Sequence, residues 1–313
     1  MIGTGRIANR FVPEAKTVQG IQLAAVYHPR IAGAAVFASK WEIPLATDEW
    51  EDFCEAVDGV YIASPHGTHV DYVKRLLSTG KHVLCEKPMC FWAKEAEELF
   101  ALAEEKRLVL MEAVKTAYCP GFQELIKVAQ SGVIGEIKDV EACFTKLENP
   151  DGRELNSEQY AGSFYELGTY AILPAIKLLG EPKEVFFQSI CAEGKRADGF
   201  TKAHLIYEDA FAMSKTGLTV KSEGCLIISG TKGYIYAEAP WWLTKRFEVR
   251  FEDVGATKKY ECEFAGQGLR YEIQAFVDRI RAEDNKEISN VGLSKEDSIQ
   301  MAGVMERFHD KIR

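Results

Sequence analysis

The segment KHVLCEKP, residues 81–88, runs from apolar side chains into an acid, a cation and a proline. Val83 and Leu84 are typical of a buried strand, and Pro88 ends it because proline fixes the backbone and lacks an N–H. In an open parallel α/β sheet, ligands bind beyond the carboxyl ends of the strands. Lys87 could present an ammonium to a bound oxygen there. The alternative is a surface Glu-Lys turn, and the rest of the chain decides between the two.

Composition indicates a globular protein large enough for two domains, with 313 residues of which 47% are hydrophobic and 27% charged. The net charge of −9, without a basic run, argues against nucleic-acid binding. No apolar run reaches the roughly 18–20 residues that span a bilayer, and no signal-peptide pattern opens the chain. Eight cysteines form no CxxC pair, so we expect reduced thiols, no metal site and a cytoplasmic protein.

The first eight residues, MIGTGRIA, contain the spacing G-x-G-x-x-A. This spacing is typical of the turn that presents a helix N-terminus to a pyrophosphate, so we expect Gly3, Gly5, Arg6 and Ile7 to bind a dinucleotide. Only two residues precede the first glycine, although a central strand should lie there. We therefore expect the natural protein to carry about four to six further apolar residues, the usual strand length.

The apolar run from Gln22 to Tyr27 predicts a second buried strand, which ends in His28-Pro29-Arg30. An enzyme specific for NAD usually places an acid here for the ribose 2′-hydroxyl, whereas an arginine suits the 2′-phosphate of NADP. His28 and Arg30 therefore favour NADP, with NAD as the other choice. The alternative is a solvated loop that contacts no ligand.

Strands and helices alternate up to about residue 120. Apolar strands are expected at 59–63, 83–84 and 108–111, with helices at 32–40, 70–77 and 93–103. This alternation predicts a parallel sheet of βαβ units, a doubly wound Rossmann domain over residues 1–120.

The loop after the third strand reads Ser64-Pro65-His66-Gly67-Thr68-His69. Ser64, His66 and His69 are expected either to line the cofactor crevice or to cap the following helix. The two histidines lie three apart, as metal ligands on a helix can, but no nearby carboxylate or thiol completes a metal site.

The pattern changes over residues 121–313. A helix near 122–129 precedes the alternating segment 136–144, and further strand-like runs lie at 184–190, 203–208, 224–229, 233–237, 246–251 and 259–264. This pattern predicts an antiparallel sheet with one face polar or used for association. A last helix from Ser294 should bury Met301, Val304, Met305 and Phe308, and it packs either here or back on the first domain.

A helix from about Phe164 would set Glu166 and Tyr170 four residues apart on one face. A carboxylate and a phenol so placed can transfer protons. The alternative is a partly buried helix whose tyrosine has a structural hydrogen bond.

The order of these motifs resembles that of the glucose–fructose oxidoreductase/inositol dehydrogenase (Gfo/Idh/MocA) family, and within it the branch of dihydrodiol dehydrogenase. The motifs are the glycine turn, Ser-Pro-His-x-x-His, Glu-Lys-Pro, Met111-Glu112-Ala113 and the segment from Gly162 to Tyr170. The resemblance implies a Rossmann domain and a C-terminal α/β domain with an open, largely antiparallel sheet. That sheet is often used for dimerisation, so a homodimer or homotetramer is expected.

The resemblance also implies residue roles. Glu86 would contact the nicotinamide ribose, Lys87 would meet the reacting hydroxyl, and the bond between Lys87 and Pro88 would be cis. A tyrosine matching Tyr170 would be the general acid/base, its pKa lowered by the lysine, with Glu166 assisting.

Two departures bear on these roles. Glu166 stands where the family usually has aspartate, which lengthens its reach by one methylene. Lys115 and Ala117 stand where the dihydrodiol-like pattern has an aromatic residue and an arginine, so substrate contacts there should differ.

The sequence thus predicts an NAD(P)-dependent oxidoreductase that acts on a secondary alcohol or carbonyl of a sugar, polyol or diol, without a nucleic-acid or membrane partner. The alternative is a non-catalytic NAD(P)-binding sensor of the same fold.

Overall fold

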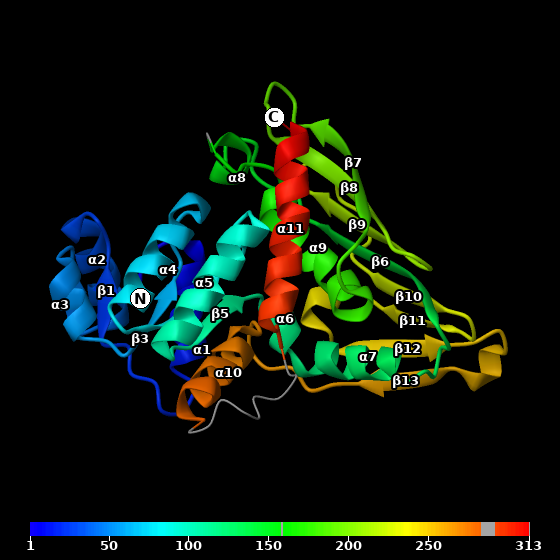
Figure 1. Ribbon diagram of the computed structural model, residues 1–313, viewed down its shortest axis with the longest axis horizontal. Helices are drawn as coiled ribbons and strands as arrows, with labels where there is room; N and C mark the ends of the chain where they lie inside the picture. The colour runs from blue at the N-terminus through cyan, green and yellow to red at the C-terminus, as the bar shows by residue number, and fades with distance from the viewer. Residues whose placement is uncertain (158, 283–291, 313) are drawn as a thin grey trace. The chain divides into compact units, whose positions relative to one another are not determined.

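The computed structural model describes residues 1–157, 159–282 and 292–312, and the chain divides into two compact units (Figure 1). The first unit comprises Met1–Cys90, Lys94–Tyr118 and Ala265–Lys295. The second comprises Phe91–Ala93, Cys119–Phe264 and Glu296–Arg313. The expected division after residue 120 lies close to the change at 118/119. Residues 265–295 also belong to the first unit.

Among its described residues, the first unit contains five short strands in two parallel ladders. Strand β1 (Ala25–Tyr27) pairs with β2 (Leu45–Thr47), and β4 (His82–Glu86) lies between β3 (Gly59–Ile62) and β5 (Leu110–Ala113). The parallel βαβ arrangement is confirmed. The strand expected from Gln22 begins only at Ala25, and β2 was not predicted because its three residues carry no usable periodicity.

Met1 and Ile2 join the two ladders. Ile2 forms isolated parallel bridges with Tyr27 of β1 and Ile62 of β3, and the Met1 ammonium donates to the Ala25 carbonyl over 2.7 Å. Both side chains are buried. Ile2 therefore occupies the strand position that the glycine spacing predicts. A cavity of about 460 Å³ adjoins Met1, with apolar lining residues that include Phe11, Leu23, Leu84 and Phe276.

The helices of the first unit lie between these strands or after them in the chain. They are α1 (Arg6–Ala15), α2 (Ile31–Trp41), α3 (Trp50–Glu55), α4 (His69–Ser78), α5 (Ala93–Lys106), α6 (Lys115–Tyr118) and α10 (Leu269–Arg281). Helix α4 buries Val73, Leu76 and Leu77, as its spacing predicts. It ends before Gly80, whose φ of 76° is the left-handed conformation that glycine adopts without strain.

The second unit is built on an eight-stranded sheet in the order β13-β12-β11-β10-β6-β9-β8-β7. Its strands are β6 (Ile137–Thr145), β7 (Glu184–Cys191), β8 (Asp198–Ile206), β9 (Phe211–Gly217), β10 (Leu226–Gly230), β11 (Tyr234–Ala237), β12 (Arg246–Arg250) and β13 (Lys258–Glu261). All neighbours are antiparallel except β6 and β9, which are parallel. The predicted sheet is thus largely antiparallel, as expected, with one parallel pair that includes the unpredicted strand β9.

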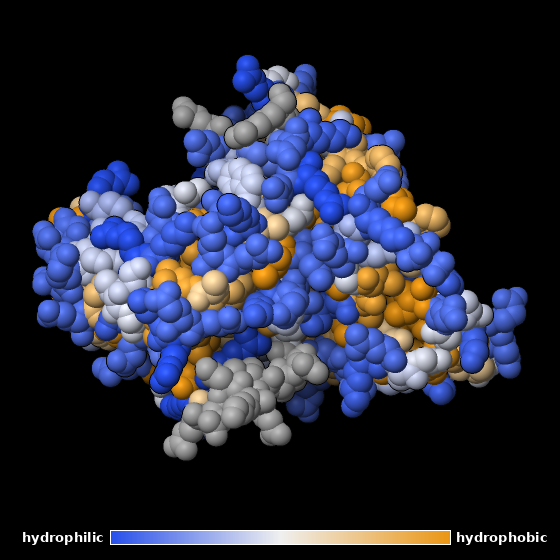
Figure 2. Space-filling model, in the orientation of Figure 1, coloured by the Kyte–Doolittle hydropathy of each residue, from blue (hydrophilic) through white to orange (hydrophobic). Residues whose placement is uncertain are grey.

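One face of this sheet is covered and the other is open. The covered face carries a row of buried residues in register, Leu205, Ala212, Val140, Ile228, Ile235 and Val249. Helix α9 (Ser163–Leu179) packs on β6, β8 and β9, and α7 (Pro120–Gln130) packs on α9. The alternate residues point to the open face, where Phe186 is 55% exposed. Figure 2 shows exposed apolar surface where Figure 1 draws these strands.

The last helix, α11 (Lys295–Ile312), buries Met301, Val304, Met305 and Phe308, as predicted. A short helix, α8 (Arg153–Asn156), precedes α9. Among the described residues, none of the helices combines the length and apolarity that crossing a membrane requires.

Candidate active site

The Glu86-Lys87-Pro88 turn lies at the carboxyl end of β4, the middle strand of its ladder. Glu86 is the last strand residue and is buried. The Tyr61 hydroxyl on β3 donates to Glu86 Oε1 over 2.5 Å, and the Lys87 amide donates to Oε2 over 3.3 Å. The bond between Lys87 and Pro88 is cis, as the family resemblance implies. The turn therefore stands at the edge of the sheet where α/β proteins bind ligands.

The carboxylate of Glu86 is held in an apolar setting. Burial raises its pKa, while the Lys87 charge and the Tyr61 hydrogen bond oppose that rise. The Tyr61 ring stacks on Phe11 of α1 with 3.7 Å between ring centroids. Because the phenol is fixed by this stacking, the carboxylate has a defined position next to Lys87.

His69 links the turn to the loop after β3. It is fully buried, and its ring nitrogens lie 2.8 Å from the Pro88 carbonyl oxygen and 3.0 Å from that of Ser64. A carbonyl oxygen only accepts and a neutral imidazole carries one N–H, so the ring tautomer decides which of the two carbonyls receives the hydrogen bond. The Ser64 hydroxyl in turn accepts from Thr68 over 2.7 Å. His69 is thus placed to position the turn.

His66 is half-buried, and its ring centroid lies 5.7 Å from that of His69. Across residues 1–157, 159–282 and 292–312, no group of three or more His, Cys, Asp or Glu side chains is arranged to hold a metal ion.

The glycine turn has the geometry its spacing predicts. Gly3 has φ 94°, and a Cβ there would lie 2.5 Å from the Ala63 carbonyl oxygen, so only glycine fits. A Cβ on Gly5 would meet nothing within 4 Å, so space remains in front of α1. The amides of Arg6 and Ile7 lie in the first turn of α1, where N–H groups lack intrahelical acceptors. Such amides can donate to a phosphate.

The loop after β1 carries the two residues that favour NADP. Arg30 is exposed, stands just before α2, and donates its backbone N–H to His28 Nδ1 over 3.0 Å. Because β1 is parallel to the other strands, this loop leaves the same edge of the sheet as the Lys87 turn. An exposed guanidinium there suits a 2′-phosphate.

In the second unit, α9 carries Glu166 and Tyr170 one turn apart, as predicted. Glu166 is buried, and its Oε1 lies 4.0 Å from the guanidinium of Arg153. Tyr170 is half-buried, with its ring centroid 5.4 Å from that of Phe144 on β6. A carboxyl and a phenol thus share one helical face.

The start of α9 is anchored by Asp198 of β8, which sequence reasoning missed. Asp198 Oδ2 accepts from the Ser163 hydroxyl over 2.5 Å, the Phe164 amide over 3.0 Å and the Thr201 hydroxyl over 2.6 Å. Burial raises the pKa of Asp198, and these hydrogen bonds oppose the rise. Asp198 lies 34 residues from Phe164, so no local capping pattern indicates it.

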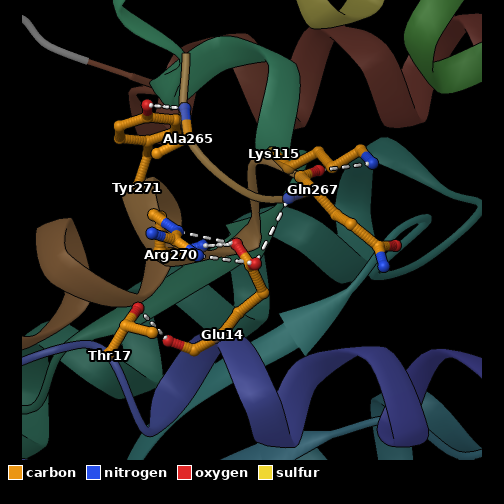
Figure 3. Close-up of polar contacts among 7 residues, drawn as sticks. All are labelled: Glu14, Thr17, Lys115, Ala265, Gln267, Arg270 and Tyr271. Atoms are coloured by element: carbon orange, nitrogen blue, oxygen red, sulfur yellow. Dashed lines mark hydrogen bonds and ion pairs between the residues drawn. The ribbon is translucent and has the colours of Figure 1, made fainter.

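A second polar cluster in the first unit was also missed (Figure 3). Glu14 on α1 accepts from Arg270 Nε and Nη2, each over 3.0 Å, and from the amides of Gln267 and Arg270 over 3.2 Å. Burial raises the pKa of Glu14, but the hydrogen bonds and the charge of Arg270 leave it below its usual value. Lys115 donates to the Gln267 carbonyl over 2.9 Å. The segment that leads into α10 is thereby fastened to both α1 and α6.

Fold and site together define a nucleotide-binding oxidoreductase of the α/β class, and comparisons with known proteins agree. The oxidoreductase family with an NAD-binding Rossmann fold (GFO/IDH/MocA) matches residues 1–114, and the GFO/IDH/MocA C-terminal domain matches residues 122–236. The scyllo-inositol 2-dehydrogenase (NADP(+)) of Bacillus subtilis is 31% identical, over 98% of this chain and 94% of that protein. The human trans-1,2-dihydrobenzene-1,2-diol dehydrogenase is 28% identical, over 87% of this chain and 84% of that protein.

Solved structures show the same fold. A 3-ketoreductase from Actinomadura kijaniata superposes with a TM-score of 0.82 at 23% identity, covering 97% of this chain and 94% of that one. A UDP-N-acetylglucosamine 3-dehydrogenase from Acidithiobacillus ferrooxidans superposes with a TM-score of 0.80 at 20% identity, covering 98% and 94%. The chain belongs to the GFO/IDH/MocA oxidoreductase family.

Proposed function

We propose that the protein is an NADP-dependent dehydrogenase or reductase for a secondary alcohol or carbonyl of a polyol, diol or sugar. The observation that carries this proposal is the Glu86-Lys87-Pro88 turn at the ligand-binding edge of the sheet, with its carboxylate fixed by Tyr61. The Bacillus subtilis relative is named for scyllo-inositol and NADP(+), and the human relative for a dihydrobenzene diol. NAD is the alternative cofactor.

Several residues of the first unit fit such a cofactor. The close approach of Gly3 to Ala63 and the space in front of Gly5 leave the first amides of α1 able to donate to a pyrophosphate. Arg30 is exposed where a 2′-phosphate would be bound. Glu86 would accept a hydrogen bond from a ribose hydroxyl. Ser64 and His66 would line the cofactor crevice, and His69 would fix the positions of the two loops beside it. The bound nicotinamide would supply or accept the hydride.

The chain's own residues would manage the charge and the proton. An alcohol that loses a hydride must also lose a proton, so a base at its oxygen is needed. Lys87 would donate a hydrogen bond to that oxygen and stabilise its negative charge. Tyr170 would move the proton, and Glu166 would assist it from one turn away on α9.

A non-catalytic NAD(P)-binding sensor is the second candidate. It is favoured by Glu166, which replaces the family's usual aspartate and lies 4.0 Å from Arg153. An ion pair there would leave Glu166 less available for proton transfer.

Formation of reduced nicotinamide separates the two candidates. We expect purified protein to raise the absorbance of the reduced cofactor when it receives NADP⁺ with scyllo-inositol, other inositols, aldoses or trans-dihydrobenzene diol. At least one substrate should support turnover, with NADP⁺ preferred over NAD⁺. Cofactor binding without turnover in either direction, tested also with NADPH and the matching ketones, would favour the sensor.

We further propose that the open face of the eight-stranded sheet forms a homodimer or homotetramer. Phe186, Ile190 and Phe211 are 55%, 67% and 61% exposed on strands β7 and β9, and exposed apolar patches mark association sites. Light scattering after gel filtration tests this proposal. Wild type should be an oligomer, and Ile190→Glu should shift it towards monomer; an unshifted oligomer would contradict the use of this face.

A cytoplasmic location stays a prediction, which the eight free cysteines support.

A further inference from the structure

Glu272 on α10 is a carboxyl group buried without a hydrogen-bond partner. It is 0% exposed, and neither of its carboxyl oxygens has a partner among the described residues. A charged carboxylate in that position would lose its hydration without replacement, so the neutral acid is the favoured form. Nothing in the proposed reaction uses this group.

The charged groups that act on Glu272 come from β4 and α6. Burial and the charge of Glu86 raise the pKa of Glu272 well above its usual value, and the ammonium of Lys115 opposes that rise. Tyr118 on α6 also interacts electrostatically with Glu272, and the other ionisable groups of the surrounding elements have partners of their own. Glu14 on α1 binds Arg270, and Glu112 on β5 accepts from the Met89 amide over 3.0 Å. Arg279 on α10 donates to the Leu293 carbonyl over 3.0 Å. The Tyr118 hydroxyl donates to the Glu112 carbonyl over 3.3 Å.

Glu86 and Glu272 therefore differ in what surrounds them. Glu86 accepts hydrogen bonds from Tyr61 and from the Lys87 amide, which favour its ionised form. Glu272 has neither. Two neighbouring carboxyls in such unequal settings share a proton unequally, and the one without donors keeps it.

We propose that Glu86 and Glu272 form a carboxyl pair that holds one proton, on Glu272, and that this proton is released to solvent when an oxidised nicotinamide binds beside Glu86. The inference rests on the proposed function, since it requires an NADP site at the Lys87 turn. An oxidised nicotinamide ring carries a positive charge and a reduced ring does not. The positive ring offsets the repulsion between two carboxylates, so Glu272 ionises only with the oxidised cofactor. Glu272 acts through Glu86 and does not touch the reacting atoms. Its protonation makes the affinity for the oxidised cofactor depend on pH.

Proton release is measurable by titration calorimetry in two buffers of different ionisation enthalpy. The 2′-phosphate of the cofactor also titrates, near pH 6, but it is common to both redox forms and cancels in their difference. For wild type we expect NADP⁺ binding to release more protons than NADPH binding. As pH rises, the Kd for NADP⁺ should therefore fall by up to about tenfold per pH unit relative to the Kd for NADPH. Glu272→Gln keeps a neutral group of the same shape and should abolish the difference. Glu97→Gln, which removes an exposed carboxylate of α5, should leave it unchanged.

The apo protein gives an independent readout. A carboxyl whose folded pKa is raised stabilises the fold at low pH, and that contribution is lost as pH rises above the ordinary glutamate value towards the raised one. We therefore expect the urea midpoint of Glu272→Gln to gain on that of wild type as pH rises above the ordinary glutamate pKa, whereas Glu97→Gln runs parallel to wild type. Glu272→Met answers the same question if the amide variant fails to fold.

The outcomes separate the two proposals. Absence of NADP(H) binding overturns the proposed function and the proton release with it. Binding of both forms with equal proton release in wild type, or an undiminished difference in Glu272→Gln, overturns the inference alone. Parallel stability curves for wild type and Glu272→Gln also overturn it.

Discussion

Tyr61 on β3 donates a hydrogen bond of 2.5 Å to Glu86 on the neighbouring strand β4. The ladder pairs Tyr61 with Leu84, so the phenol reaches two residues further along β4 to the end of the strand. Its ring is stacked on Phe11 and cannot follow the carboxylate if that group moves. The residue before Lys87 is therefore positioned by the sheet, which is more rigid than a loop.

Removing the Tyr61 hydroxyl tests this support. Tyr61→Phe keeps the stacking on Phe11 but leaves Glu86 Oε1 without its donor. We expect the free energy of unfolding to fall by about 2 kcal/mol, as for other hydrogen bonds to charged groups. Tyr260→Phe on β13, where the ring stacks on Phe247, is the control and should change stability by less than about 0.5 kcal/mol. Equal urea midpoints for both variants would contradict a role for the hydroxyl.

The glycine turn gives a paired prediction. Gly3 and Gly80 both have positive φ, but a Cβ on Gly3 would overlap the Ala63 carbonyl whereas one on Gly80 would meet nothing within 4 Å. Gly80→Ala should cost about 1–2 kcal/mol from backbone strain alone. Gly3→Ala should cost at least about 2 kcal/mol more because the chain must also move apart. Urea denaturation of the two variants measures the difference, and equal losses would contradict the close approach.

The pair of buried Glu14 and half-buried Arg270 predicts a pH dependence. Because the folded pKa of Glu14 lies below its usual value, its contribution to stability is present above that value and is lost as pH falls through the folded pKa. Arg270→Met should lower the free energy of unfolding at neutral pH by about 3 kcal/mol, since it removes the charged partner of a buried carboxylate and leaves only two backbone amides as donors. The loss should shrink at acidic pH.

A surface pair is the control for that prediction. Lys74→Met removes the partner of Glu98 in an exposed ion pair and should cost no more than about 0.5 kcal/mol at any pH. If the effect of Arg270→Met in urea unfolding is equally small, or does not depend on pH, Glu14 does not need its partner.

Asp198 should control the start of α9. Asp198→Ala leaves the Ser163 and Thr201 hydroxyls and the Phe164 amide without their acceptor, so we expect a loss of about 3 kcal/mol in unfolding free energy. Asp198→Asn retains one acceptor oxygen and should lose less than half as much. Thermal and urea unfolding measure both variants. If the alanine variant is no less stable than the asparagine variant, Asp198 does not anchor the helix.

The sequence predicts elements whose periodicity is long and regular. The four buried residues of α11 follow from helical spacing, and the parallel ladder of β3, β4 and β5 follows from alternation of strands with helices. Strand β9, FAMSKTG, has a lone large aromatic residue, and that residue is 61% exposed. Its parallel pairing with β6 is set by tertiary contacts, which local propensity does not encode.

The site divides in the same way. The glycine turn and Glu86-Lys87-Pro88 are each a short continuous segment, so they could be recognised in the sequence. The buried acids Glu14 and Asp198 could not, because their partners lie far away in the chain. Glu14 binds residues more than 250 positions away. Glu272 does leave a signal, because buried Leu269, Ile273 and Phe276 lie on one face of α10 and Glu272 falls on the same face. An ionisable residue among the apolar residues of one helix face therefore indicates a buried acid from the sequence alone.

The most direct test of the account is the turnover of Lys87→Met with NADP⁺ and the best polyol or diol substrate. We expect NADP(H) binding to stay within a few-fold of wild type and turnover to fall by a factor of about 10² to 10⁴, the usual contribution of a group that assists proton transfer. Lys81→Met, directly before the same strand, should keep wild-type turnover. Wild-type-like turnover of Lys87→Met would contradict the central claim that this lysine meets the reacting oxygen.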